Sequence, residues 1–226
     1  MDIHDVSASG QLIQLLTKQK ETLNAAMARQ GEQPDDRGSR SELANKFMLQ
    51  SITQRSARSR MKLEFHSSFV PPPYPPSTAR LEELRQIFIK DLKLGTHHRG
   101  SYILVRPITP PNRMTAIMAV VEDEKEDAVV LQLYQQEDES DRPATSVIKQ
   151  NDVFLVKEPY FKIMSDGEYG LRVDHVSDLV YIEVHNEMVP KQWGPRILDV
   201  GKTTNDWKLE GNDAMKRQQY WIAIQR

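Results

Sequence analysis

The 226-residue chain is 38% apolar, carries a net charge of −2 and contains no cysteine. Without cysteine it can form neither disulfides nor thiolate-ligated zinc sites, and thiol catalysis is excluded. The charge is uneven, because residues 81–200 carry 14 basic and 21 acidic side chains whereas residues 1–80 carry 11 and 8. No run approaches the roughly 20 apolar residues of a membrane-spanning helix, so we expect no membrane association.

Residues 1–80 are predicted to form a flexible tail with two short helices and a proline-rich linker. Apolar residues recur at helical spacing in both helices, and Ser39 and Glu42 form a capping box before the second. The apolar positions are Leu12, Leu16, Leu23 and Met27, followed by Leu43, Phe47 and Ile52. These stripes either dock on a partner or on the strand-rich part of the chain, or they belong to marginal helices in a mobile tail.

The linker FVPPPYPPS, residues 69–77, is predicted to be extended because consecutive prolines fix φ and remove hydrogen-bond donors. Pro71, Pro72 and Tyr74 fit the PPxY pattern that WW domains bind, with Tyr74 filling the pocket. A stiff spacer explains the same composition. The basic run before the linker, residues 55–62, is either a nuclear-import or phosphate-binding patch or a solvated helix end.

Residues 81–202 are predicted to form a small OB-like five-stranded β-barrel, which makes the chain mainly β with flanking helices. Period-two apolar patterning recurs there over consecutive segments separated by turn residues. The predicted strands are Tyr102–Ile108, Met114–Val121, Ala128–Tyr134, Val153–Met164 and a fifth from Tyr169, with a short helix, ATSVIKQ, between the third and fourth. This order is that of the OB-fold, although an SH3-like barrel or a small sandwich would give a similar pattern.

Residues 203–226 are predicted to form an incomplete tetratricopeptide repeat. Thr203 and Asp206 begin a helix, and the spacing of small and aromatic residues after it matches the start of such a repeat. A single half-repeat leaves its apolar face uncovered, so we expect either a truncated product or the first part of a longer protein. Tyr220 and Trp221 are predicted to bind a partner.

No catalytic, cofactor-binding or metal-ligating residue is predicted. The sequence GKT at residues 201–203 lacks the first glycine of a P-loop. His97 and His98 are adjacent on an extended segment, so they point to opposite sides and cannot share one ion. The acidic pairs lie in charged turns, where solvation keeps their acidity ordinary, and no G-x-S-x-G elbow is present.

Three stretches resemble the N-terminal region of fungal proteins that combine tetratricopeptide repeats with a SET domain. They are THHRGSYILVRPITPPNRMTAIMAVVEDEKEDAVVLQLYQQE, VKEPYFKIMSDGEYGLRVDHVSDLVYIE and LEGNDAMKRQQYWIAI. The resemblance implies a SET domain after the repeats that transfers methyl groups from S-adenosylmethionine to protein lysines. The asparagine-histidine-cysteine signature of that domain has no counterpart here. The expectation is therefore that this chain has no cofactor of its own, and S-adenosylmethionine is expected only if a SET domain follows.

The function expected from these observations is a non-catalytic interaction or adaptor region. In full-length relatives it would position a protein-lysine methyltransferase or its substrates, with protein partners and a cytoplasmic or nuclear location. The alternative is an OB-fold module for single-stranded nucleic acid, with stacking faces and cations at Tyr134, Tyr160, Phe161, Tyr169, Arg113 and Arg172. Such binders need a positive groove, whereas residues 81–200 total −7, so nucleic acid is disfavoured.

Overall fold

The computed structural model describes residues 24–61, 73–150, 152–164, 166–183, 186–194 and 203–218, together with residues 13, 14, 17, 20, 21 and 220. Its helices are α2 (Arg40–Met61), α3 (Ala144–Val147) and α4 (Thr204–Lys216), with 3-10 turns η1 (Leu81–Glu83), η2 (Ile89–Asp91), η3 (Val176–Asp178) and η4 (Lys191–Trp193). Its strands are β1 (Arg85–Gln86), β2 (Thr96–His97), β3 (Ser101–Pro107), β4 (Asn112–Arg113), β5 (Ile117–Glu122), β6 (Ala128–Leu133), β7 (Val153–Lys157), β8 (Tyr160–Ile163), β9 (Tyr169–Val173) and β10 (Leu179–Ile182). The prediction of a mainly β chain with flanking helices is confirmed.

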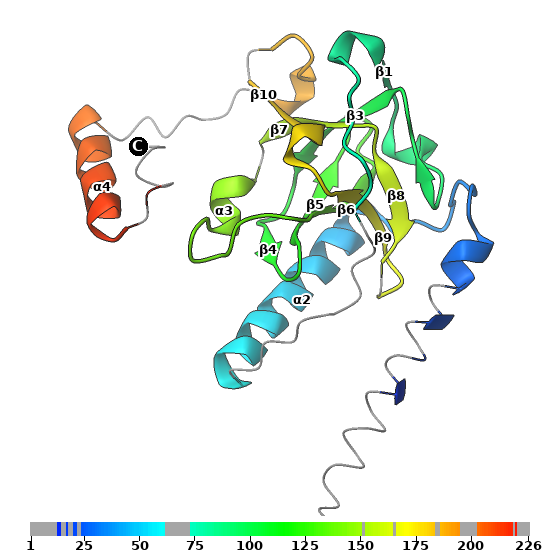
Figure 1. The fold of residues 1–226 in the computed structure, drawn as a ribbon, viewed down its shortest axis with the longest axis horizontal. Coiled ribbons are helices and arrows are strands. Elements are labelled where there is room, and N and C mark those ends of the chain that lie inside the picture. The colour runs from blue at the N-terminus through cyan, green and yellow to red at the C-terminus, as the bar shows by residue number, and fades with distance from the viewer. Residues whose placement is uncertain are drawn as a thin grey trace, which may run out of the picture.

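The strands form one mixed sheet of ten strands (Figure 1). Its order is β10-β7-β3-β5-β6-β9-β8-β2, with β1 paired to β3 and β4 paired to β5. Most pairs are antiparallel, but β6 and β9 are parallel, as are β1 and β3. This order is that of an open sheet, so the pairing does not confirm the closed five-stranded barrel.

The predicted fourth strand, residues 153–164, is divided in two by a bend at Glu158. The φ of Glu158 is 45°, a left-handed conformation that a continuous strand cannot contain. The Glu158 carboxylate holds this bend, because it accepts hydrogen bonds from the backbone N–H of Gly100 at 2.9 Å and from the guanidinium of Arg99 at 2.6 Å. As a result β7 pairs with β3 and β10, whereas β8 pairs with β9 and β2.

Strand register places the main core on one face of the sheet, and on the other face it groups polar side chains at β8 and β9. Phe161 of β8 lies opposite Leu171 of β9, which lies opposite Leu131 of β6, and all three are fully buried. Because successive side chains of a strand alternate between faces, the residues beside these three point outward. The outer face of β6, β9 and β8 therefore carries a set of polar side chains that includes Arg172 and Lys162.

Helix α2 packs on the outer face of the sheet at β5 and β6 (Figure 1). Its buried Phe47 contacts an apolar cluster that includes Val120, Val130 and Met164. An ion pair from Arg40 to the buried Glu122 fixes the start of the helix. Much of the segment expected to be a flexible tail thus contacts the sheet, although the outer side of α2 leaves Met48, Leu49 and Ile52 exposed.

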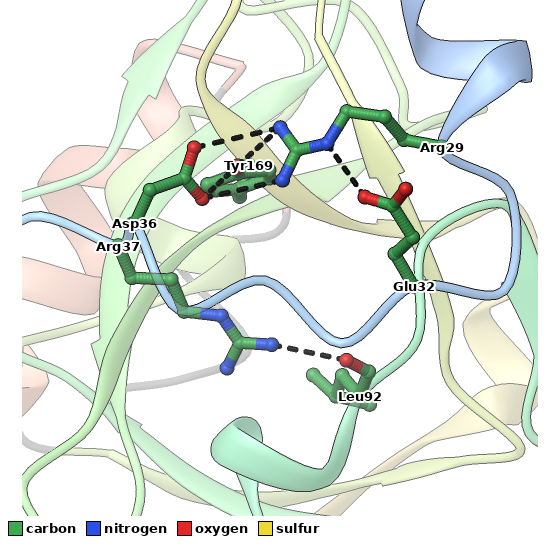
Figure 2. Close-up of polar contacts among 6 residues, drawn as sticks. All are labelled: Arg29, Glu32, Asp36, Arg37, Leu92 and Tyr169. Atoms are coloured by element: carbon green, nitrogen blue, oxygen red, sulfur yellow. Dashed lines mark hydrogen bonds and ion pairs between the residues drawn. The ribbon is translucent and has the colours of Figure 1, made fainter.

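The segment before α2 is held to the sheet by a set of polar contacts that we call the N-terminal clamp. The clamp consists of Arg29, Glu32, Asp36, Arg37 and Tyr169, drawn in Figure 2. Arg29 pairs with Glu32 at 2.9 Å and donates to the Tyr169 hydroxyl at 2.9 Å, and that hydroxyl donates to Asp36. Arg37 donates to the carbonyls of Ile89 and Leu92, the latter at 3.0 Å, and lies over the Phe161 ring.

At the other end of the described chain, α4 begins with the predicted capping box. The Thr203 hydroxyl accepts from the Asp206 N–H at 3.3 Å, and the Asp206 carboxylate accepts from the Thr203 N–H at 2.8 Å. Only this first helix of the predicted pair has described bounds, so the tetratricopeptide hairpin is not confirmed. Among the described residues, no helix has both the length and the apolar character needed to cross a membrane.

Candidate functional site

The outer face of β6, β9 and β8 brings two cations onto one aromatic ring. We call this group, Tyr134, Lys162 and Arg172, the cationic site. The Arg172 Cζ lies 5.2 Å from the centre of the Tyr134 ring, and the Lys162 Nζ lies 5.7 Å from it. Lys162 is paired in register with Gly170, which has no side chain, so the next outward side chain on β9 is that of Arg172.

Arg172 is fixed in place by a buried carboxylate. Its Nε donates to Asp174 Oδ1 at 2.7 Å, and the two side chains are only 4% and 1% exposed. The second oxygen of Asp174 accepts from the Tyr74 N–H at 3.2 Å. Because a buried charge is tolerated only when it is paired and hydrogen-bonded, this pair is a rigid part of the site.

Lys162, by contrast, makes no hydrogen bond or ion pair with any described residue. Burial, and next the neighbouring charge of Arg172, lower its pKa to about 8, against the weaker opposing effects of Asp174 and Asp166. At neutral pH an appreciable fraction of this amine is therefore uncharged. An uncharged amine is a nucleophile and a base, which an ordinary surface lysine is not.

Tyr74 forms an aromatic wall beside the cationic site. Its ring lies 4.5 Å from that of His97, 5.8 Å from that of His175 and 6.1 Å from that of Tyr160. Its hydroxyl donates to the Arg172 carbonyl at 3.0 Å and accepts from the Asp174 N–H at 3.2 Å. Burial raises the pKa of Tyr74 and lowers that of His97, so neither group is charged at neutral pH.

These contacts engage the Tyr74 side chain, which the sequence predicted to fill a WW-domain pocket. A WW domain would have to displace the Tyr74 ring from His97 and its hydroxyl from β9. Pro71, Pro72 and Trp221 lie outside the described residues, and Tyr220 is 58% exposed. Partner binding by these five residues remains a prediction.

The residues proposed for base stacking are separated by the fold. Phe161 is in the core, and Tyr169 belongs to the N-terminal clamp. Arg113 donates to Glu139 at 2.5 Å and to two loop carbonyls, away from Arg172. The structure therefore brings together only Tyr134, Tyr160 and Arg172 of that set, on one outer face.

Sequence reasoning missed Lys162 and the neighbours of Tyr74. The signal available was alternation, because Lys162 follows the core residue Phe161 and must therefore face outward. The contact with Tyr134 depends on the parallel pairing of β6 with β9, which joins segments almost 40 residues apart in sequence. No local pattern marks that pairing.

Other candidate sites have structural explanations. In the described part of the chain no group of three or more His, Cys, Asp or Glu residues is arranged to hold a metal. His98 is engaged by the Pro159 carbonyl and the Lys93 N–H, each at 3.0 Å. Of residues 201–203, only Thr203 is described, and it caps α4.

A small cleft lies between α2 and the sheet. It has a volume of about 50 Å³ and is lined mainly by Leu43, Phe47, Met114, Met118, Val130 and Met164, with polar groups including Ser51 at its rim. The Ser51 hydroxyl is buried and has no hydrogen-bond partner. A cleft of this volume accommodates a few water molecules.

Comparison with known proteins finds one similar curated protein and no matching family model. A protein of the fungus Gibberella zeae (strain PH-1), named "Methyltransferase", is 38% identical to this chain over 224 residues. The match covers 99% of this chain and 28% of the relative, so the chain spans little more than a quarter of the relative's length.

This similarity corrects the function expected from the sequence. A non-catalytic adaptor, or a module for single-stranded nucleic acid, is contradicted by a match to a protein named as a methyltransferase over almost the whole chain. The error lay in inferring an absence of catalysis from the absence of a known motif. The relative's name mentions neither tetratricopeptide repeats nor a SET domain, so those features are unconfirmed.

Proposed function

We propose that this chain forms part of a methyltransferase that uses S-adenosylmethionine. The observation that carries the proposal is the 38% identity to the Gibberella zeae protein named "Methyltransferase", which extends over 224 residues. An identity of this extent covers the sheet, α2 and α4 together, so the proposal concerns the chain as a unit. S-adenosylmethionine supplies the methyl group in this class of reaction.

Within that class we propose a protein-lysine methyltransferase of the kind that combines tetratricopeptide repeats with a SET domain. The three stretches of sequence that resemble such proteins support this, as does α4, whose capping box and length suit the first helix of a repeat. Protein substrates are the partners that follow, and a cytoplasmic or nuclear location suits them.

We also propose that the sheet is an OB-like barrel. In terms of the predicted strands, the order β7-β3-β5-β6-β9-β8 corresponds to fourth-first-second-third-fifth-fourth. Only Glu158 and Pro159 separate β7 from β8, so one bent strand pairs with both ends of the series. The parallel pairing of β6 with β9 supports the same arrangement.

The described residues do not fit S-adenosylmethionine. Pockets for ligands of that size have volumes of roughly 300 to 1,000 Å³, whereas the cleft beside α2 has about 50 Å³. The cationic site repels a sulfonium, because Lys162 and Arg172 carry the same sign of charge. No step of methyl transfer is therefore assigned to a described residue.

The proposal is tested by transplanting this chain into its relative. Three proteins are compared for methyl transfer from labelled S-adenosylmethionine to protein: the whole Gibberella zeae protein, a version lacking the matched region, and a chimera carrying this chain in its place. We expect the deletion to lower transfer at least 100-fold and the chimera to restore it to within tenfold of the whole protein.

Three results overturn the proposal. A whole relative that transfers no methyl group removes its basis, and a deletion that keeps activity within twofold shows that the region lies outside the methyltransferase. A soluble, folded chimera that stays inactive shows that this chain does not share the relative's role. Circular dichroism and gel filtration of each protein establish its folding.

A further inference from the structure

We propose that Lys162 is a nucleophilic amine on the outer face of the sheet, a modification site that takes small aldehydes as an imine. The proposal is independent of methyl transfer and concerns this side chain alone. It rests on the position of Lys162 beside Tyr134 and Arg172, and on the absence of a carboxylate partner for Lys162 among the described residues.

The surroundings of Lys162 deprive its ammonium form of stabilisation. The Tyr134 ring lies 5.7 Å from its Nζ and covers it on one side, where water would otherwise solvate the charge. The ring face attracts the ammonium, but by less than the hydration that burial removes. Arg172 lies over the same ring at 5.2 Å and places a second positive charge nearby. A desolvated lysine beside another cation is the arrangement that activates amines as nucleophiles.

The acidic groups that face Lys162 do not compensate for this. Asp174 is committed to Arg172 at 2.7 Å and to the Tyr74 N–H at 3.2 Å. Asp166 lies in an exposed turn, where its Oδ1 accepts from the Glu168 N–H. Neither carboxylate forms an ion pair with Lys162 in the described part of the molecule. Burial and Arg172 accordingly lower the pKa of Lys162.

Lys46 shows what a partner changes. It lies on the same outer face, where α2 meets the sheet, and it is paired with Glu168. That hydrogen bond raises the pKa of Lys46, the opposite of the change at Lys162. The two amines therefore differ in burial and in the presence of a carboxylate, and of the two only Lys162 is expected to react at neutral pH.

The reaction with an aldehyde needs no further reactant. The lone pair of the neutral Lys162 nitrogen attacks the carbonyl carbon and forms a C–N bond while the C=O π pair moves to oxygen, and one proton passes from nitrogen to oxygen to give a carbinolamine. The carbinolamine then loses the oxygen as water and leaves a C=N bond. The two hydrogens of the amine leave in that water, so atoms and electrons balance.

The test is competitive labelling of the whole 226-residue chain with acetaldehyde and cyanoborohydride at pH 7.4, followed by peptide mass spectrometry. Cyanoborohydride traps each imine as a stable ethyl-lysine. The uncharged fraction of an amine rises about 250-fold when its pKa falls from 10.5 to 8, and lower basicity offsets part of that gain. We expect Lys162 to react about tenfold faster than the exposed Lys208 and Lys216.

Two variants and the pH dependence of the labelling rate complete the experiment. Lys162→Arg should remove the fast-reacting peptide, and Tyr134→Ala should bring the rate at Lys162 to within about threefold of Lys208, because truncating the ring lets water reach the amine. Lys162 reacting no faster than Lys208 in the unsubstituted chain overturns the proposal. The proposal is also overturned if the labelling rate at Lys162 rises as steeply as that of Lys208 from pH 8 to pH 10. This measurement uses the unsubstituted chain, so it does not depend on either variant folding.

Discussion

Two tyrosines of this protein each hold a cation over the ring, with opposite chemical results. At Tyr169, in the N-terminal clamp, the Arg29 Cζ lies 5.9 Å from the ring centre, and Arg29 is also paired with Glu32 and Asp36. At Tyr134, in the cationic site, Lys162 and Arg172 share the ring. Arg172 has its own buried carboxylate, but Lys162 has none among the described residues.

The difference shows how carboxylate partners and burial change the pKa of a cation on an aromatic ring. In the clamp, the hydrogen bonds that Arg29 donates to Glu32, Tyr169 and Asp36 raise its pKa, and the hydrogen bond that Tyr169 donates to Asp36 lowers the pKa of Asp36. The charges of Arg29 and Asp36 are therefore stabilised, whereas burial lowers the pKa of Arg37, the clamp residue that has no carboxylate hydrogen-bond partner among the described residues. In the cationic site the pKa of Lys162 falls, which leaves an amine with chemistry of its own.

The largest effect is expected from removing the Asp174 carboxylate, which pairs with Arg172 of the cationic site. Asp174→Ala removes the buried carboxylate that accepts from the Arg172 Nε and from the Tyr74 N–H. Breaking a buried pair in this way costs about 3 to 5 kcal/mol. We expect the free energy of unfolding in urea to fall by that amount.

The matched control for this change is Asp141→Ala, an exposed aspartate for which we expect a change within about 0.5 kcal/mol. Equal effects at the two positions would mean that the Arg172–Asp174 pair contributes nothing beyond a surface charge. That result would remove the distinction at Tyr134 between Arg172, which Asp174 holds, and Lys162, which makes no ion pair with a described residue.

Next in size is the dependence of stability on pH that Lys162 introduces. Its pKa is about 8 in the folded protein, below the roughly 10.4 of an unfolded chain. Below pH 8 the folded state bears the full cost of the buried ammonium, and stability should rise by about 2 kcal/mol as the pH increases from 8 to 10.5. Urea unfolding of wild type and Lys162→Met across this range should differ by that rise, and parallel curves would contradict it.

A smaller effect is expected in the clamp, at Arg37. Arg37→Ala leaves the carbonyls of Ile89 and Leu92 without this donor and exposes the Phe161 ring. Unsatisfied acceptors of this kind cost about 1 to 3 kcal/mol. Arg85→Ala, on an exposed strand position, is the control and should change stability by less than about 0.5 kcal/mol. The interpretation fails if thermal unfolding ranks the two variants equally.

The smallest expected effect concerns His97, beside Tyr74. Burial, and then the charge of Arg99, lower its pKa below the ordinary 6.5. The folded state thus binds this proton less readily than the unfolded chain, and stability should decline as the pH falls below about 6.5. His97→Gln should flatten that decline in chemical unfolding measured at pH 7.5 and pH 5. An identical decline in the variant would assign it to other groups.

Sequence alone predicts the elements of this fold better than their connections. Alternating apolar residues indicate the strands because each strand buries one face, and Thr203 with Asp206 marks the start of α4. The bend at Glu158 escapes such reasoning, because its carboxylate contacts Arg99 and Gly100, which lie almost 60 residues earlier in the turn before β3.

The site was less predictable than the fold for the same reason. Tyr134 and Arg172 stand out as residue types, but so do Phe161 and Arg113, which the fold uses for the core and for a loop. Only the long-range register of the strands distinguishes the residues that form the site from those that the core and the loop use. The function was misjudged because a missing motif was given more weight than the family resemblance, and the match to a protein named as a methyltransferase corrected it.

The most direct test of the difference between the two tyrosines is the titration of Lys162 itself. Carbon-13 labelling of lysine side chains allows the Cε resonance of Lys162 to be followed by NMR between pH 6 and 12, with Lys162→Arg providing the assignment. A pKa of about 8, well below those of the exposed lysines, is the expected result. A value of 10 or above would show that the ammonium of Lys162 is stabilised like an exposed lysine, and would contradict the account.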